Sequence, residues 1–162
     1  MSSSSRPSFE SIRMQWVDVL AQRSTCLRQH VACVIEKDGY VISAGYNGLP
    51  SGDRNCCDTG VCLKTVAGDE DFKPCLHAEQ NALMYAARSP ISVVGGTIFI
   101  NAEPCVTCAK LIVVSKIKKV ILRSAPGSKG NEIGVNYLFG HGVEVVYMNQ
   151  DGEIYKGSVE PR

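Results

Sequence analysis

The sequence has no long hydrophobic run and no strong excess of charge of either sign. Its 17 lysines and arginines are offset by 16 aspartates and glutamates, which leaves a net charge of +1. A chain so balanced has no overall field that would attract nucleic acid or an anionic membrane. No stretch approaches the roughly 20 apolar residues of a membrane-spanning helix, and the Ser-rich segment 1–8 lacks the apolar core of a signal peptide. We therefore expect a cytoplasmic protein with neither a membrane nor a nucleic-acid partner.

Length and composition are those of one ordinary globular domain. The chain is 44% hydrophobic and 20% charged, which excludes a disordered or collagen-like protein. Its 162 residues suffice to bury a sizeable core, and no internal repeat is visible. We therefore expect residues 1–162 to form a single domain.

The hydrophobic pattern predicts five strands. They are short apolar runs bounded by turn residues, at 31–37, 40–46, 97–101, 120–123 and 143–148. Asp38-Gly39 is a strong hairpin signal, so the first two strands are expected to be antiparallel neighbours. The later strands alternate with helices, which favours parallel pairing.

Four helices are expected around these strands. The first follows Ser8, its expected cap, and its apolar residues fall at helical spacing: Ile12, Trp16, Val19 and Leu20. The others cover 77–88, the segment in which Pro104 takes the first helical position, and 131–140. A long irregular loop connects Gly45 to Cys75. The pattern predicts an α/β fold, a three-layer α/β/α sandwich around a five-stranded mixed sheet.

The chain contains eight cysteines, a number that needs an explanation. Without an export signal, and with enough length to fold around its own core, the chain does not need a disulfide framework. Thiolates in a reducing compartment remain available as soft ligands, and zinc is the ion that most often takes several of them. Metal binding is therefore the favoured interpretation.

Three residues can form one zinc site. His77 stands at the start of one expected helix, and Cys105 and Cys108 stand at the start of another, after Pro104. The spacing of the two cysteines places them on one helix face, and the helix dipole favours their thiolates. Three protein ligands leave the fourth tetrahedral position for water, which is typical of catalytic zinc. A structural zinc or a redox dithiol is the alternative.

Glu79 indicates which chemistry this site performs. A carboxylate beside a zinc-activated water can accept its proton and deliver it to a ring nitrogen and then to a departing amine. Zinc nucleobase deaminases carry His-x-Glu followed by Pro-Cys-x-x-Cys, with the Glu as acid and base rather than as ligand. Residues 77–79 and 104–108 match this described pattern. Neither alternative role needs Glu79 or Pro104, so the sequence favours hydrolytic deamination.

With these motifs the chain resembles the cytidine deaminase-like zinc enzymes, and within them the deoxycytidylate (dCMP) deaminases of bacterial and phage type. The resemblance covers nearly the whole chain, through Arg23–Cys26, Gly45–Gly48, His77–Ala82 and Glu103–Lys110. It implies that a zinc-activated water attacks C4 of dCMP, with Glu79 protonating N3 and later the leaving amine. The products would be ammonia and dUMP, which supplies thymidylate synthesis.

The resemblance also implies contacts to the nucleoside. The backbone beside Ala102 and Glu103 would hold the exocyclic amino group, and Asn47 would hold the deoxyribose 3′-hydroxyl. Asn47 lies in a turn-prone segment, so a role in backbone geometry is an equal alternative for it.

A monophosphate also needs donors. Arg28 is preferred to His30 for this role, because a guanidinium can bind phosphate bidentately. Arg88 matches a family arginine near a subunit contact and would act across an interface. For each of these alone, an exposed surface charge is the simpler explanation.

Family members of this kind are commonly hexamers that dCTP activates and dTTP inhibits. Their effector loop matches residues 45–52, with contacts at Gly45, Tyr46, Asn47, Gly48 and Gly52. The resemblance therefore implies a homo-oligomer with a nucleotide effector site, where Mg²⁺ would accompany a triphosphate.

Some phage-type members carry a second, structural zinc. The positions that match its ligands are Cys26, Cys56, Cys75 and, as the fourth, Cys62, with Cys57 as the alternative. Four thiolates would close the tetrahedron and leave no room for water. Partly buried free thiols are the other interpretation. Cys33 lies within an apolar strand and is expected in the core.

Many family members have an aromatic residue after the fourth strand, whereas residues 124–130 have none, which bears on how the nucleotide pocket closes.

Two other functions remain open. One alternative is deamination of another base, in a free nucleoside or in tRNA; the balanced charge and the short polar tail 149–162 argue against tRNA. The other is a non-catalytic, zinc-stabilised module whose Gly-rich loop senses a nucleotide.

Overall fold

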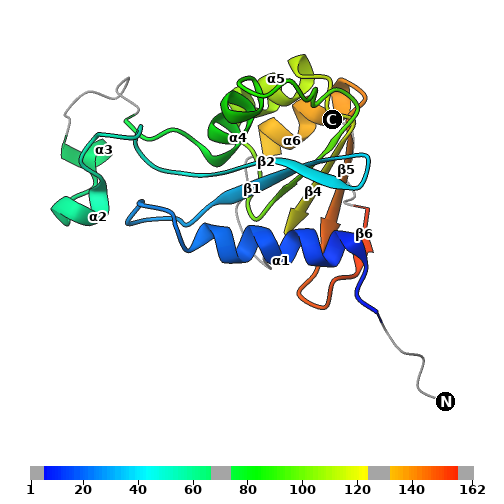
Figure 1. The fold of residues 1–162 in the computed structure, drawn as a ribbon, viewed down its shortest axis with the longest axis horizontal. Helices are drawn as coiled ribbons and strands as arrows, with labels where there is room; N and C mark the ends of the chain where they lie inside the picture. The colour runs from blue at the N-terminus through cyan, green and yellow to red at the C-terminus, as the bar shows by residue number, and fades with distance from the viewer. Residues whose placement is uncertain (1–5, 67–73, 124–131, 157–162) are drawn as a thin grey trace.

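A mixed sheet of six strands forms the middle layer of the fold (Figure 1). The computed structural model describes residues 6–66, 74–123 and 132–156. The strands are β1 (Ala32–Lys37), β2 (Tyr40–Tyr46), β3 (Thr97–Ile100), β4 (Lys119–Arg123), β5 (Glu144–Met148) and β6 (Ile154–Tyr155). Their order across the sheet is β2-β1-β3-β4-β5-β6.

The pairing confirms the predicted mixed sheet. β3, β4 and β5 are parallel neighbours, whereas β1 pairs antiparallel with both β2 and β3. The turn between β1 and β2 has Asp38 and Gly39 at φ 51° and 83°, the positive values that a tight hairpin of this kind requires. A sixth strand was not predicted: β6 has two residues within the polar tail and pairs antiparallel with β5.

Helices cover both faces of the sheet, which confirms the three layers (Figure 1). They are α1 (Phe9–Ala21), α2 (Cys56–Thr59), α3 (Leu63–Val66), α4 (Ala78–Ala86), α5 (Val106–Val114) and α6 (Glu132–Gly140). α1 packs on one face, and α4, α5 and α6 lie on the other. α2 and α3 are single turns that lie to one side of the sheet, within the segment that was expected to be irregular.

The strand alternation divides the core into two parts. Ile98 and Ile100 face α4, α5 and α6, while Phe99 between them faces α1. All three side chains are buried, as the period of two in a strand requires when both faces are covered. Cys33 is fully buried in β1, which confirms its expected place in the core.

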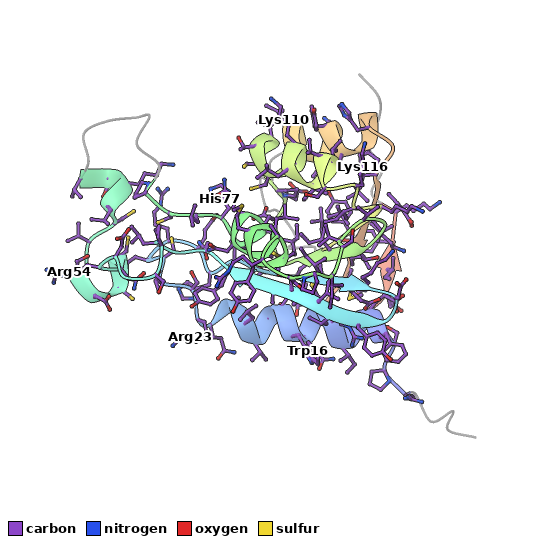
Figure 2. The ribbon with its side chains drawn as sticks, turned by 45° about the horizontal axis from the view of Figure 1, so that its top comes forward. Trp16, Arg23, Arg54, His77, Lys110 and Lys116 are labelled. Carbon is purple, nitrogen blue, oxygen red and sulfur yellow. The ribbon has the colours of Figure 1, made fainter. Side chains whose placement is uncertain are left out.

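The face of α1 that packs on the sheet differs from the expected one. Ser8 does cap the helix, accepting the N–H of Ser11 at 3.0 Å. However, Trp16 is 50% exposed and points away from the sheet (Figure 2), while Met14 and Val17 are fully buried. Arg13 lies on this buried face because its guanidinium pairs with Glu36 of β1 at 3.0 Å and donates to the Gly39 carbonyl at 2.8 Å.

Some expectations fall outside the described residues. The loop 124–130, with its missing aromatic residue, lies there, as do parts of the irregular loop before His77 and of the polar tail. Within the part of the chain that is described, no helix combines the length and the apolar character needed to cross a membrane.

Candidate active site

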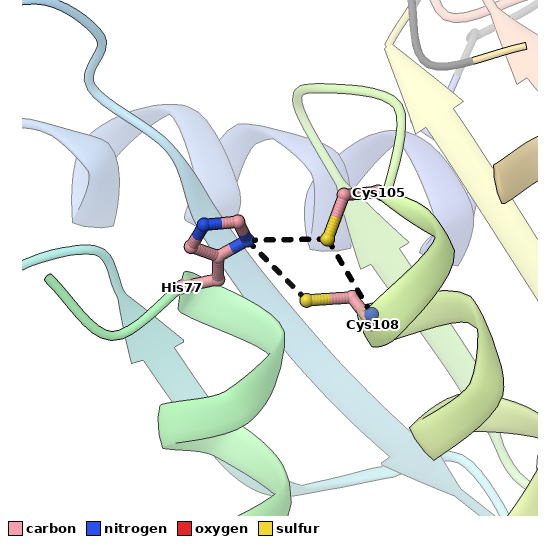
Figure 3. A group of neighbouring side chains, drawn as sticks. All are labelled: His77, Cys105 and Cys108. Atoms are coloured by element: carbon pink, nitrogen blue, oxygen red, sulfur yellow. Dashed lines mark hydrogen bonds between the residues drawn. The ribbon is translucent and has the colours of Figure 1, made fainter. Parts of the chain in front are cut away.

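The candidate site lies where the N-termini of α4 and α5 meet (Figure 3). His77 is the cap residue of α4, and its N–H donates to the side-chain oxygen of Gln80 at 2.8 Å. Cys105 is the cap residue of α5, and its Sγ accepts the N–H of Cys108 at 3.5 Å. Pro104 therefore precedes the cap, so its predicted place as the first helical residue is wrong. The helices bring His77 and both cysteines into the gap between them.

The distances within this group match those of a tetrahedral zinc site. Nδ1 of His77 lies 3.6 Å from Sγ of Cys105 and 3.4 Å from Sγ of Cys108. Zinc bonds of about 2.0 Å to nitrogen and 2.3 Å to sulfur at tetrahedral angles separate N and S by about 3.6 Å. Among the residues that the structure describes, this group alone has its ligand atoms within 4.8 Å of one another. The chain thus presents one nitrogen and two sulfur donors at the spacing that zinc requires.

Charge is distributed unequally between the two thiols. Hydrogen bonds from the Cys108 side chain and from His77 lower the pKa of Cys105 to about 3. The hydrogen bond to Cys105, together with burial, raises the pKa of Cys108, and the hydrogen bond to Cys105 also raises the pKa of His77. One thiolate is therefore ready as a ligand, and a metal cation would favour loss of the second thiol proton.

Glu79 lies beside this group in the first turn of α4. Its side chain is 3% exposed and hydrogen-bonds the Cys108 thiol, and burial raises its pKa. A cavity of about 100 Å³ opens next to it; its walls include His77, Glu79, Cys105, Ala102, Glu103 and Asn47. The structure thus brings together the residues expected to hold the metal, move protons and contact the base.

A second, larger cavity adjoins the first and is called the outer cavity here. It measures about 330 Å³ and shares Gln29, Asn47 and His77 with the inner one. Arg28, the preferred candidate for a phosphate contact, lines this outer cavity, whereas His30 lines neither. Lys64 also lines it, although no pattern in the sequence singled this residue out.

Asn47 is held by several hydrogen bonds at the boundary between the two cavities. Its Oδ1 accepts from the Ser24 hydroxyl at 2.6 Å and from the Val31 N–H at 2.9 Å. Its Nδ2 donates to the Gln29 carbonyl at 2.9 Å, which leaves one amide hydrogen for another acceptor. Asn47 therefore fixes the backbone, as one sequence interpretation held, and still faces the cavity in which a sugar hydroxyl would lie.

Arg88 is not part of either cavity. It lies at the exposed end of α4, with its guanidinium 5.2 Å from the centre of the Tyr85 ring. Arg88 is therefore exposed to solvent, and the role expected for it across a subunit contact would involve a second copy of the chain.

The loop 45–52 forms a separate pocket of about 420 Å³. Gly45, Tyr46, Gly48 and Gly52 line this pocket, but Asn47 faces the two other cavities instead. Gly45 has a packing role as well, because a Cβ there would lie 2.5 Å from the Ala78 carbonyl oxygen. The expected effector residues are thus brought together with the exception of Asn47.

Four of the remaining cysteines gather near α2 and α3. Burial, together with charges on the neighbouring thiols of Cys56, Cys26 and Cys62, raises the pKa of Cys75 to about 11. Desolvation of Cys62 is outweighed by hydrogen bonds from the backbone of Lys64 and Thr65 and from Arg28, so its pKa is lowered. The other candidate, Cys57, is exposed and contacts Asp58 instead, which favours Cys62 as the fourth member.

Residues that brace the site were not found from sequence. Asn101 accepts the Ala32 N–H at 2.9 Å and donates to the His30 carbonyl at 3.0 Å, which ties β3 to the segment before β1. Tyr147 of β5 donates to Oε1 of Glu103 at 2.8 Å. A polar residue directly after a buried strand was a usable signal for Asn101, whereas nothing local marks Tyr147.

A family model supports the resemblance. Residues 8–124 match the cytidine and deoxycytidylate deaminase zinc-binding region. The chain is 36% identical over 124 residues to a deoxycytidylate deaminase of Mycobacterium phage D29, covering 72% of this chain and 95% of that protein. This chain is also 34% identical over 124 residues to the deoxycytidylate deaminase of Schizosaccharomyces pombe, covering 74% of this chain. In the relatives from S. pombe and Saccharomyces cerevisiae, the match spans 38% of their length.

Solved structures agree with the sequence matches. The dCMP deaminase of cyanophage S-TIM5, in complex with dCMP and dUMP, superposes with a TM-score of 0.72 and 33% identity over 88% of this chain and 98% of that one. A tRNA:A34 deaminase superposes less well, with a TM-score of 0.56 at 22% identity, and shows a shared fold alone. The extent of these matches, together with the zinc-binding motif on two facing helix ends, shows that the chain belongs to the cytidine and deoxycytidylate deaminase family.

Proposed function

We propose that this chain is a zinc-dependent enzyme that hydrolyses dCMP to dUMP and ammonia. The observation that carries the proposal is the spacing of Nδ1 of His77 from the sulfurs of Cys105 and Cys108, with the buried Glu79 beside them. The phage relatives named deoxycytidylate deaminase, and the cyanophage structure with dCMP and dUMP, support this choice of substrate. The reaction would supply dUMP for thymidylate synthesis. We infer a single domain over residues 1–162 and a place in the cytoplasm, of a host cell if the source is viral.

His77, Cys105 and Cys108 would hold the catalytic zinc. The donor set of one nitrogen and two sulfurs, at the separations given above, fits a tetrahedral ion with one open position. When bound there, zinc supplies a water of low pKa at neutral pH. The chain's own contribution is to fix three ligands on rigid helix ends before the metal arrives.

Glu79 would transfer the protons. Its burial raises its pKa towards the range in which a carboxyl can both accept and return a proton near neutral pH. It would accept one proton of the attacking water and deliver it to N3 of cytosine. It would then take the second proton from the hydroxyl formed on C4 and pass it to the leaving amine. The water's oxygen stays on C4 as the carbonyl of dUMP, and ammonia leaves.

The cavity walls would orient the nucleotide. The backbone beside Ala102 and Glu103 would accept a hydrogen bond from the exocyclic amino group, because both residues line the inner cavity. The free amide hydrogen of Asn47 would donate to the 3′-hydroxyl, and Arg28 would contact the phosphate in the outer cavity. Arg88 would complete the phosphate site from another subunit.

A second zinc would be structural. The thiols of Cys26, Cys56 and Cys62 act electrostatically on Cys75, and the lowered pKa of Cys62 favours a thiolate. Four sulfur ligands would exclude water, so this ion would stabilise the fold around α2 and α3 without taking part in the reaction.

Regulation would use the pocket at the loop 45–52. We propose dCTP as activator and dTTP as inhibitor there, with Mg²⁺ accompanying the triphosphate, in a homo-oligomer that we expect to be a hexamer. Gly45, Tyr46, Gly48 and Gly52 line a pocket large enough for part of a nucleotide, and Arg23 supplies a positive charge in its wall. Asn47 would take part indirectly, because it belongs to this loop but lines the two substrate cavities instead.

The test is a turnover assay with the zinc-loaded chain. Loss of cytosine absorbance is followed with dCMP, CMP, dCTP, cytidine and deoxycytidine as separate substrates. We expect dCMP to be the best substrate, and Glu79→Gln to retain zinc while losing turnover. Turnover of a nucleoside but of no monophosphate would overturn the substrate assignment. Absence of turnover with all five compounds would overturn the enzyme itself and leave the nucleotide-sensing module.

A further inference from the structure

Two positively charged side chains line the outer cavity, and the residues described along its wall include no acidic one. Arg28 comes from the segment after α1, and Lys64 comes from the single turn α3. The remaining walls are formed by cysteines, uncharged polar residues, Pro74 and His77. Arg28 and Lys64 therefore offer two positive charges to an anionic ligand, in a wall that also contains the thiols of Cys26, Cys62 and Cys75.

The two cavities are neighbours on either side of shared residues. Asn47, Gln29 and His77 line both, so a ligand that contacts Asn47 from the inner cavity would lie beside the outer one. A pyrimidine ring at Glu79 would place its sugar near Asn47. The 5′ substituent of that sugar would then enter the cavity that Lys64 and Arg28 line.

Lys64 is better placed than Arg28 to supply a free charge. The Arg28 side chain already hydrogen-bonds the Cys62 thiol, which engages part of its donor set. Lys64 forms no ion pair with any acidic residue in the described part of the chain. Lys64 lines the same cavity as Asn47 and His77, the residues shared with the inner cavity.

We propose that Lys64 binds the 5′-phosphate of the substrate, together with Arg28, and so makes the enzyme select nucleotides over nucleosides. The inference rests on the proposed function, because it takes the cytosine ring to lie at Glu79. An ammonium group acts as a compact point charge on a flexible stem, which suits a phosphate at the end of a mobile ligand. Phosphate would therefore contact two cations from segments that are remote in sequence.

Binding of the product provides a test that does not depend on turnover. Dissociation constants of dUMP and of deoxyuridine are measured by calorimetry for the zinc-loaded protein and for Lys64→Met and Lys64→Arg. Loss of one charge-assisted contact should weaken dUMP binding about tenfold in Lys64→Met. Lys64→Arg should restore most of it, because the charge is kept. Deoxyuridine, which has no phosphate, should bind all three proteins equally.

A matched control is Lys110→Met. Lys110 lies on α5 with its ammonium 5.9 Å from the centre of the Tyr137 ring, and it lines neither cavity. We expect this variant to bind dUMP as the unsubstituted protein does, so that a general change in surface charge is excluded as the cause.

The outcomes separate this inference from the proposed function. Equal dUMP binding by Lys64→Met and the unsubstituted protein would overturn the role of Lys64, and so would an equal loss for deoxyuridine. A protein that binds dUMP through Lys64 but does not turn over dCMP would overturn the proposed function alone. Failure of the unsubstituted protein to bind dUMP would overturn both.

Discussion

The two cysteine groups of this chain are held in different ways. His77, Cys105 and Cys108 lie at the starts of α4 and α5, two nine-residue helices whose inner faces are buried in the core. The group of Cys26, Cys56, Cys62 and Cys75 lies around α2 and α3, each of four residues, and α3 has no buried residue. Correspondingly, the first group has its ligand atoms within 4.8 Å of one another and the second does not.

This difference indicates how each group would relate to its metal. Burial of Ala82, Ala109 and Ile112 fixes the first group whether or not an ion is bound. In the second group α3 contributes no buried residue, so the binding energy of a metal would have to order the backbone there. The catalytic site is therefore preorganised, whereas the structural site would be completed by its ion.

Cys105→Ser breaks the first group and should have the largest effect on activity. Removing a thiolate ligand should release the catalytic zinc and lower turnover of dCMP by about a thousandfold or more, because the low-pKa water is lost. The thermal midpoint should change little, since α5 keeps its buried face. Zinc content, steady-state kinetics and a melting curve measure these effects.

The control for this variant is Cys57→Ser. Cys57 is exposed and contacts Asp58, so its replacement should leave zinc content, turnover and melting unchanged. If Cys105→Ser kept its zinc and its activity, the proposed ligand set would be wrong.

Cys62→Ser tests the second group and should affect local order more than chemistry. If the four cysteines hold a structural zinc, the metal content should fall from about two ions per chain to about one. Amide hydrogen exchange should then become faster over residues 56–66, while α4 and α5 keep their protection. Unchanged metal content, together with unchanged exchange, would contradict a metal in this group and favour free thiols.

How far the sequence predicted these regions depends on how local their determinants are. The ligands His77, Cys105 and Cys108 stand in short motifs at helix starts, so spacing alone brought out the site. The place of Lys64 depends on how α3 is held against segments more than 30 residues earlier in the chain, and no local pattern encodes that. The prediction of the buried face of α1 was wrong because it placed Trp16 there. Arg13 lies on that face instead, and its ion pair with Glu36 explains why a charged residue is buried.

Gly134→Ala probes the packing that supports the first group. A Cβ on Gly134 would overlap the carbonyl oxygen of Pro104 and lie 2.9 Å from the carbonyl carbon of Cys105. These are backbone atoms, which cannot move away by a side-chain rotation, so α6 would have to shift. We expect a loss of about 1–3 kcal/mol of unfolding free energy and a fall in turnover. Gly140→Ala, in the same helix with open space around it, should be close to neutral. Denaturant unfolding measures both, and equal stability of the two variants would contradict this role of Gly134.

Tyr147→Phe should give the smallest of these effects, and it acts on the first group from outside the family-matched residues 8–124. Its hydroxyl donates to Oε1 of Glu103 at 2.8 Å, directly before the Pro104-Cys105 turn. Loss of a hydrogen bond to a carboxylate that is partly buried should cost about 1–2 kcal/mol of unfolding free energy. The ring keeps its packing against Tyr155, whose centre is 5.9 Å away, so the fold should persist. Zinc content should stay constant while kcat falls several-fold, because the wall formed by Ala102 and Glu103 loses its support. A variant with lower stability but unchanged kcat would show that the hydrogen bond only stabilises β5.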